Sequence, residues 1–149
     1  MKALIITLLC FLSVAAHSTE FRHIGDFLLQ SHFKVTESGI TPIPMKSVAF
    51  KVYTDGVTIR INLLEDEKEA YTSFDIYRSD GISRQRAESG AIEVIPGIQA
   101  SSNSGGTLRH LRLSQESFTL TTFPGVSDQT IVSHAVVAIP KDSESSKKP

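Results

Sequence analysis

The chain has 149 residues, of which 40% are hydrophobic and 21% are charged, enough for one compact domain. Its 15 Lys and Arg against 16 Asp and Glu give a net charge of −1 at pH 7, which excludes a nucleic-acid-binding protein of strongly positive overall charge. With 9 Gly and 6 Pro, the composition also excludes collagen-like and low-complexity chains.

Residues 1–18 have the order of a secretory signal peptide. Lys2 supplies a positive charge, Ala3 to Ala16 form an uncharged run, and small residues follow it. As a helix this run is about 21 Å long, against a hydrocarbon core of roughly 30 Å, so we expect it to be removed and to leave no stable transmembrane span. Cleavage after Ala16 and cleavage after Ser18 both fit the small-residue rule.

The single cysteine of the chain, Cys10, lies inside this uncharged run. The mature chain then has no cysteine and can form no disulfide. A cysteine-free exported domain fits a bacterial periplasm better than a eukaryotic extracellular space. We therefore expect an exported protein, periplasmic or secreted.

The mature chain is predicted to begin with a helix. From Thr19 to Phe33, apolar residues recur at helical spacing, namely Phe21, Ile24, Phe27 and Leu28. The stretch that follows, 38–44, contains two prolines, Pro42 and Pro44. Because proline donates no hydrogen bond to a sheet, we expect this stretch to be at most an edge strand.

A β-hairpin is predicted around Asp55-Gly56, a dipeptide typical of type I′ turns. With these two residues as the loop, the alternating apolar side chains of both strands share one face, in the pairs Val52–Ile59, Phe50–Ile61 and Val48–Leu63. On the other face, the same register sets two like charges opposite one another, Lys51 and Arg60.

A second hairpin, predicted around Asp80-Gly81, provides the candidate binding surface. A two-residue loop here sets Tyr77 opposite Arg84, and Asp75 opposite Arg86, on one face. Because guanidinium groups bind carboxylates and phosphates through two hydrogen bonds, these four residues form a candidate site for an anion or a glycan. The alternative is that the charges pair only across the strands and keep a solvated face soluble.

Further strands are predicted where β-branched and apolar residues are frequent, at 92–95, 107–113, 117–123 and 130–139. Three polar stretches are predicted to lie outside the sheet: a charged connection at 65–69, a flexible loop at 99–106 and a disordered tail at 141–149. The expected fold class is therefore α+β. Residues 19–140 form a single domain in which one N-terminal helix packs on a mainly antiparallel, curved sheet, either a meander or a partial barrel.

Motifs of the common enzyme classes are absent from the sequence. There is no glycine-rich phosphate loop, no zinc-protease motif and no nucleophile elbow. His23 and His32 are nine residues apart, on opposite sides of the predicted helix, and cannot share a metal ion. We therefore predict no catalytic residue, no metal site and no cofactor.

Three functions stay open, and the sequence favours the first. It is a small, non-catalytic binding or structural domain that acts through an envelope protein or glycan. The alternative is a carrier that holds an apolar ligand or lipid between the sheet and the helix, in a cavity lined by Phe50, Ile61 and Phe118. A small hydrolase, with a histidine bonded to a serine or an acid in a cleft, is a weaker alternative. A cavity at these three residues would indicate the carrier, and close packing there would indicate the binding domain.

Overall fold

The computed structural model describes residues 20–63, 71–85, 89–125 and 127–138. These residues form eleven β-strands and no helix. The strands are β1 (Arg22–Thr36), β2 (Gly39–Pro42), β3 (Ala49–Thr54), β4 (Thr58–Leu63), β5 (Tyr71–Arg78), β6 (Ile82–Gln85), β7 (Ile92–Ile95), β8 (Gly97–Ser104), β9 (Thr107–Ser114), β10 (Ser117–Phe123) and β11 (Thr130–Val137).

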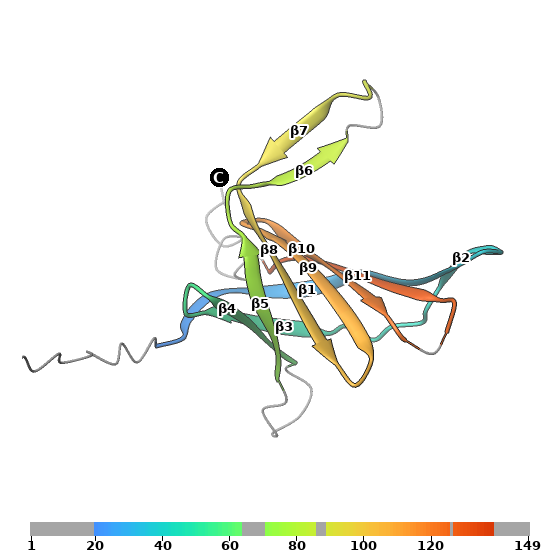
Figure 1. Cartoon of the computed structure of the whole chain (residues 1–149), viewed down its shortest axis with the longest axis horizontal. Helices are drawn as coiled ribbons and strands as arrows, with labels where there is room; N and C mark the ends of the chain where they lie inside the picture. Colours follow the sequence, from blue (N-terminus) through green and yellow to red (C-terminus); the bar gives the residue numbers. More distant parts are fainter. Residues whose placement is uncertain (1–19, 64–70, 86–88, 126, 139–149) are drawn as a thin grey trace, which may run out of the picture.

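The strands form a closed antiparallel barrel (Figure 1). Eight strands pair in chain order, β1, β3, β4, β5, β8, β9, β10 and β11, and β11 then pairs with β1 to close the sheet. Strand β2 extends the far end of β1, while β6 and β7 form a separate hairpin that projects from the barrel between β5 and β8 (Figure 1). Closure leaves each of the eight strands with a partner on both sides, so the barrel itself has no free edge.

The predicted N-terminal helix is wrong, and with it the α+β fold class, because β1 occupies most of that segment. Its side chains alternate as in a strand: Phe27 is buried at 1% exposure, whereas Ile24 and Leu28 are 39% and 36% exposed. Phe27 faces Val137 of β11 on one side and Phe50 of β3 on the other. The segment forms a strand because it pairs with β3 and β11, although its apolar residues also have helical spacing.

The barrel interior is filled by side chains from all eight strands. The buried core consists of Phe27, Val52, Ile59, Ile61, Phe74, Ala100, Leu111, Leu113, Phe118 and Ala135. At its centre the Phe118 ring lies 5.3 Å from Phe27 and 5.4 Å from Phe50, in tilted and edge-to-face geometries. Burial of these side chains provides the main favourable free energy of folding.

The first predicted hairpin exists, but its register differs from the prediction by two residues. Val52 faces Ile61 instead of Ile59, and the turn is at Gly56-Val57 instead of Asp55-Gly56. The Asp55 carboxylate accepts the N–H groups of Val57 and Thr58 at 2.9 and 2.6 Å, which favours the later turn. A shift of two residues keeps every side chain on its predicted face, so the apolar face of the hairpin is confirmed.

The polar face of that hairpin changes with the register. Arg60 faces Tyr53, and Lys51 faces Asn62, so the expected Lys51–Arg60 pair is wrong. The two cations are diagonal neighbours instead of direct cross-strand partners.

The second predicted hairpin does not form. Strand β5 pairs with β4 and β8, and β6 pairs only with β7. The segment 99–106, predicted to be a flexible loop, lies mostly in β8. The fully buried Ala100 faces Leu111 in the core, and the neighbouring Gln99 and Ser101 are on the outer face. A strand with a polar outer face and one small core residue carries almost no hydrophobic signal in sequence.

The later strands are as predicted or nearly so. Strand β10 has the predicted bounds, β7 does too, and β9 and β11 differ only at their C-terminal ends. The proline-containing stretch contributes β2, which pairs with β1 alone and is an edge strand. The predicted signal peptide, the charged connection at 65–69 and the tail at 141–149 lie outside the described residues.

Candidate functional site

Three of the four residues of the predicted anion site, Asp75, Tyr77 and Arg84, are described, and Arg84 is not on a strand next to the other two. Asp75 faces Ser101 of β8, and Tyr77 is the extra residue of a β-bulge between Ile76 and Arg78. The backbone of Arg84 pairs with Glu93 in the projecting hairpin, and Arg86 lies outside the described residues. The cross-strand pairing predicted between Tyr77 and Arg84 is therefore not formed, because β5 pairs with β4 and β8 while β6 pairs with β7.

Tyr77 instead takes part in a hydrogen-bond chain on the outer face of the barrel. Its hydroxyl donates to Gln99 Oε1 at 3.0 Å, and Gln99 Nε2 donates to the Gly81 carbonyl at 3.2 Å. The Tyr77 hydroxyl also bonds to His110 Nε2, which donates when the imidazole proton is on that nitrogen. This chain links β5, β8 and β9 to the start of the projecting hairpin.

Three groups on this side of the barrel, Arg78, Asp80 and His110, have shifted pKa values. Partial burial, with the positive charge of Arg112 nearby, lowers the pKa of His110, so the neutral imidazole is favoured. The hydrogen bond from Arg78 lowers the pKa of Asp80, and the same pair raises the pKa of Arg78. Both members of that pair are exposed, so the pair contributes little to stability.

The predicted apolar site has a counterpart at one end of the barrel. A cavity of about 280 Å³ opens there, lined by Phe50, Ile61, Leu63, Tyr71, Thr72, Phe74 and Leu120. These residues come from β3, β4 and β5 and, across the barrel, from β10. We call it the mouth pocket, because Leu63 and Tyr71 are the last residue of β4 and the first of β5.

Two of the three residues predicted to line an apolar cavity line the mouth pocket. Phe50 and Ile61 line the mouth pocket, but Phe118 does not. Phe118 is 1% exposed and lies deeper, packed between Phe27 and Phe50. Leu63 and Leu120 also line the mouth pocket and are not among the three predicted residues, although the alternation that predicts Ile61 places both on the inner face.

The chemistry of the mouth pocket is apolar. None of the described lining residues is charged, and among them only Tyr71 and Thr72 carry a polar side-chain group, a hydroxyl. Such a surface binds hydrocarbon or aromatic groups by removing them from water. It contains no nucleophile with an adjacent base.

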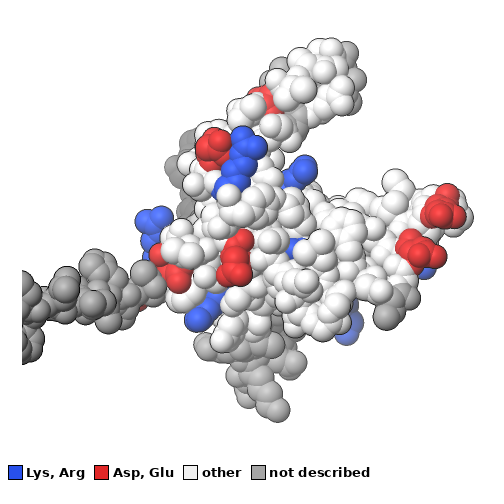
Figure 2. Space-filling model, in the orientation of Figure 1, with Lys and Arg blue, Asp and Glu red and all other residues white. Residues whose placement is uncertain are grey.

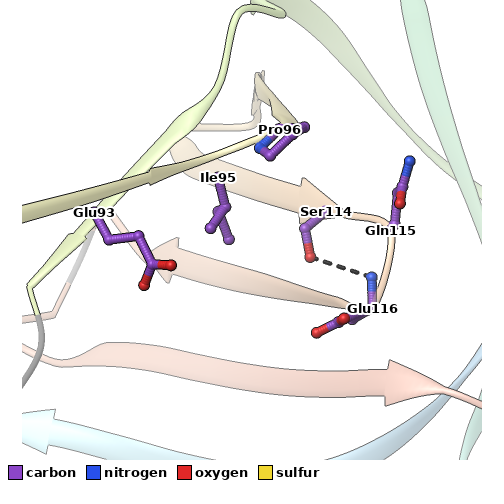
Figure 3. Close-up of a pocket in the computed structure, with 6 residues that line it drawn as sticks. All are labelled: Glu93, Ile95, Pro96, Ser114, Gln115 and Glu116. Carbon is purple, nitrogen blue, oxygen red and sulfur yellow. Dashed lines mark hydrogen bonds between the residues drawn. The ribbon is translucent and has the colours of Figure 1, made fainter.

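A second pocket lies between the projecting hairpin and the β9–β10 turn (Figure 3). It has a volume of about 270 Å³ and is lined by Glu93, Ile95, Pro96, Ser114, Gln115 and Glu116. Ser114 Oγ accepts the backbone N–H of Glu116 at 3.3 Å and that of Ser117 at 3.1 Å, so its hydroxyl stabilises the turn. The two carboxylates would favour a cationic group here, but none of the described lining residues is a base positioned to activate Ser114.

The histidines make local pairs. His32 Nδ1 and Ser133 Oγ share a hydrogen bond of 2.9 Å, and His134 Nδ1 lies 3.2 Å from Thr119 Oγ1. The His32–Ser133 pair is the arrangement expected of a hydrolase, yet the His32 imidazole donates no hydrogen bond to a described carboxylate that could orient it. Within the described residues no three His, Cys, Asp or Glu side chains are grouped as metal ligands require.

Charge is distributed evenly over the face seen in Figure 2, where described acidic and basic side chains are interspersed. No helix in the described part of the chain is long and apolar enough to cross a membrane. Comparison with known protein families, with curated proteins and with solved structures found no match.

Proposed function

We propose that this protein is an exported, non-catalytic carrier that binds a small apolar ligand in the mouth pocket. The observation that carries the proposal is a cavity of about 280 Å³ on the inner face of a closed barrel, lined by apolar side chains and open at one end. Eight-stranded barrels have an interior just wide enough to be filled by side chains or to hold one small ligand. Here the inner part is filled, and only the end beyond Phe50 and Phe74 is hollow.

The size of the pocket limits the ligand. Drug-sized ligands occupy pockets of roughly 300–1,000 Å³, so this one suits a single aromatic group or the end of an acyl chain. Export rests on the pattern of residues 1–18, and the barrel interior replaces the sheet-and-helix interface as the location of the ligand.

Binding of the uncharged fluorescent probe N-phenyl-1-naphthylamine tests the proposal. Leu63→Asp places a carboxylate at the rim of the mouth pocket and should weaken probe binding at least tenfold, because burying a charge beside an apolar ligand is costly. Leu108→Asp is the matched control, since Leu108 is 46% exposed on β9 and Leu63 is 41% exposed. Equal probe affinity in the two variants and the wild type would refute the carrier.

A second candidate function, binding to an envelope partner, is supported by the projecting hairpin. Ile92 and Val94 are 76% and 61% exposed on β7, next to each other on one face of the hairpin. An envelope protein captured by the wild type and lost in an Ile92→Ser, Val94→Ser variant with an unchanged melting temperature would favour this function. Capture that is unaffected by the double substitution would exclude the hairpin as the contact.

A further inference from the structure

The outer wall of the barrel contains an arginine in an unusual environment. Arg60 lies on β4 between Ile59 and Ile61, which both point into the core, so its side chain is on the outside. It faces Tyr53 on β3 and Ser73 on β5. Because its two neighbours are fixed in the core at 0% and 7% exposure, the position of Arg60 on the wall is fixed too.

Two aromatic rings flank the Arg60 guanidinium. Its central carbon lies 3.7 Å from the centroid of Phe21 and 4.7 Å from that of Tyr71. Both contacts are close enough for cation–π attraction, which stabilises the charge while it excludes water from the faces of the group. As a result Arg60 Nε is buried, and it has no hydrogen-bond partner. A buried donor without an acceptor is rare and points to a missing acceptor.

No described carboxylate supplies that acceptor. The His23–Asp26 and Arg78–Asp80 ion pairs do not include Arg60. Lys51, diagonal to Arg60 across β3 and β4, adds a second positive charge. Asp26 faces Lys51 from β1, but its carboxylate already accepts a hydrogen bond from His23 at 2.8 Å. On the β5 side Asp75, which faces Thr58, is diagonal to Arg60, so the outer wall here carries charges of both signs. The unpartnered group is Arg60 Nε itself.

The same residues enclose a hollow. A pocket of about 280 Å³ is lined by Phe21, Tyr53, Arg60, Asn62 and Tyr71, and we call it the wall pocket. It combines a guanidinium with an amide, two phenol hydroxyls and three aromatic rings. A planar guanidinium binds a carboxylate through two parallel hydrogen bonds, and the rings offer apolar surface to whatever carries that carboxylate.

We propose that the wall pocket binds a small organic carboxylate with an apolar body, the carboxylate on Arg60 and the body against the aromatic rings. This site is separate from the mouth pocket, although Tyr71 lines both. It differs from the anion site predicted at Arg84 and Arg86. It depends on Arg60, which the sequence singles out only because the predicted register sets it opposite Lys51.

Benzoate is the probe, and benzamide is its neutral counterpart of the same shape. In ¹H–¹⁵N spectra of the full mature chain, benzoate should shift the Arg60 Nε–H signal and the backbone signals of β3 and β4, and benzamide should bind at least tenfold more weakly. Equal binding of benzoate and benzamide by the wild type would overturn the proposal. That comparison needs no variant and so does not depend on one folding.

Variants test the role of Arg60 itself. Arg60→Gln should weaken benzoate binding at least tenfold, and Arg60→Lys, which keeps the charge but loses the planar pair of donors, should be intermediate. Arg112→Gln is the matched control, an exposed outer-face arginine on β9, and should bind benzoate within twofold of the wild type. Unchanged affinity in a folded Arg60→Gln variant would overturn the assignment. Because N-phenyl-1-naphthylamine is uncharged, its binding to the mouth pocket reports independently on the proposed carrier function.

Discussion

Replacing Phe118 by alanine tests the architecture of the barrel most directly. Phe118 is 1% exposed and makes ring contacts with Phe27 and Phe50 across the interior. Truncation of a buried phenylalanine costs about 3–5 kcal/mol, from lost burial and from the cavity left behind. Two aromatic pairs are lost with it, each worth about 0.5–1.5 kcal/mol beyond burial, so we expect a cost in the upper half of that range.

Phe123→Ala is the matched control, since it is the same substitution on the same strand. Phe123 is 43% exposed and is on the outer face, five residues after Phe118. Its loss should lower the free energy of unfolding by less than about 1 kcal/mol, as for exposed side chains in general. Urea unfolding at constant pH gives both values, provided the dependence on urea concentration is the same for both variants. A similar cost at the two positions would refute the assignment of inner and outer faces on β10, and with it the closed barrel.

Two further predictions concern the root of the projecting hairpin and the pH dependence of stability. A Cβ at Gly97 would lie 2.6 Å from the Leu113 carbonyl oxygen and 2.5 Å from Ile82 Cδ1, so Gly97→Ala should cost about 1–3 kcal/mol in urea unfolding. Gly25→Ala, whose nearest contact is 3.4 Å, should cost much less, and a reversed order would contradict the close packing of the hairpin and β9 against Gly97 of β8. The pKa of His110 is lower in the folded state, so the unfolded chain binds more protons as the pH falls. The stability that the neutral His110 contributes is therefore fully present above its unfolded pKa of about 6.5, and it is lost as the pH falls towards the folded pKa. His110→Gln should therefore flatten the decline in melting temperature between about pH 7 and pH 5, and an NMR titration of His110 with a midpoint above 6.5 would contradict the sign.

The part of the fold that the sequence predicts well is the part fixed by local alternation. The alternation of β3 and β4 predicts the inner face correctly, although the observed turn lies one residue later than the predicted one. Moving the turn by one residue shifts the pairing by two residues, and such a shift leaves every side chain on the same face. The turn itself depended on the Asp55 carboxylate, which bonds to N–H groups two and three residues later. These hydrogen bonds favour a turn at Gly56-Val57 over the turn that the Asp-Gly dipeptide predicts, and the alternation of apolar residues does not reveal them.

The parts that failed depend on contacts between distant segments. The apolar residues of β1 satisfy helical spacing, and their pairing with β3 and with the distant β11 selects the strand. Tyr77 and Arg84 are not paired because β8, and not β6, is the partner of β5 in the barrel, while β6 and β7 pair with each other as a separate hairpin. The turn sequence around Asp80-Gly81 does not predict which strand pairs with β5, because that pairing depends on closure of the whole sheet.

The two proposed sites are linked by the alternation of one strand. On β4, Ile61 lines the mouth pocket from inside and Arg60 lines the wall pocket from outside. A ligand at either site binds only the folded barrel, so each must raise its stability in proportion to the logarithm of ligand concentration. Independent sites would give additive stabilisation. Tyr71 lines both pockets, and its ring also contacts the Arg60 guanidinium. A ligand that moves this ring in the mouth pocket changes the environment of Arg60, so additivity should fail, and replacing Tyr71 by a smaller residue should restore it.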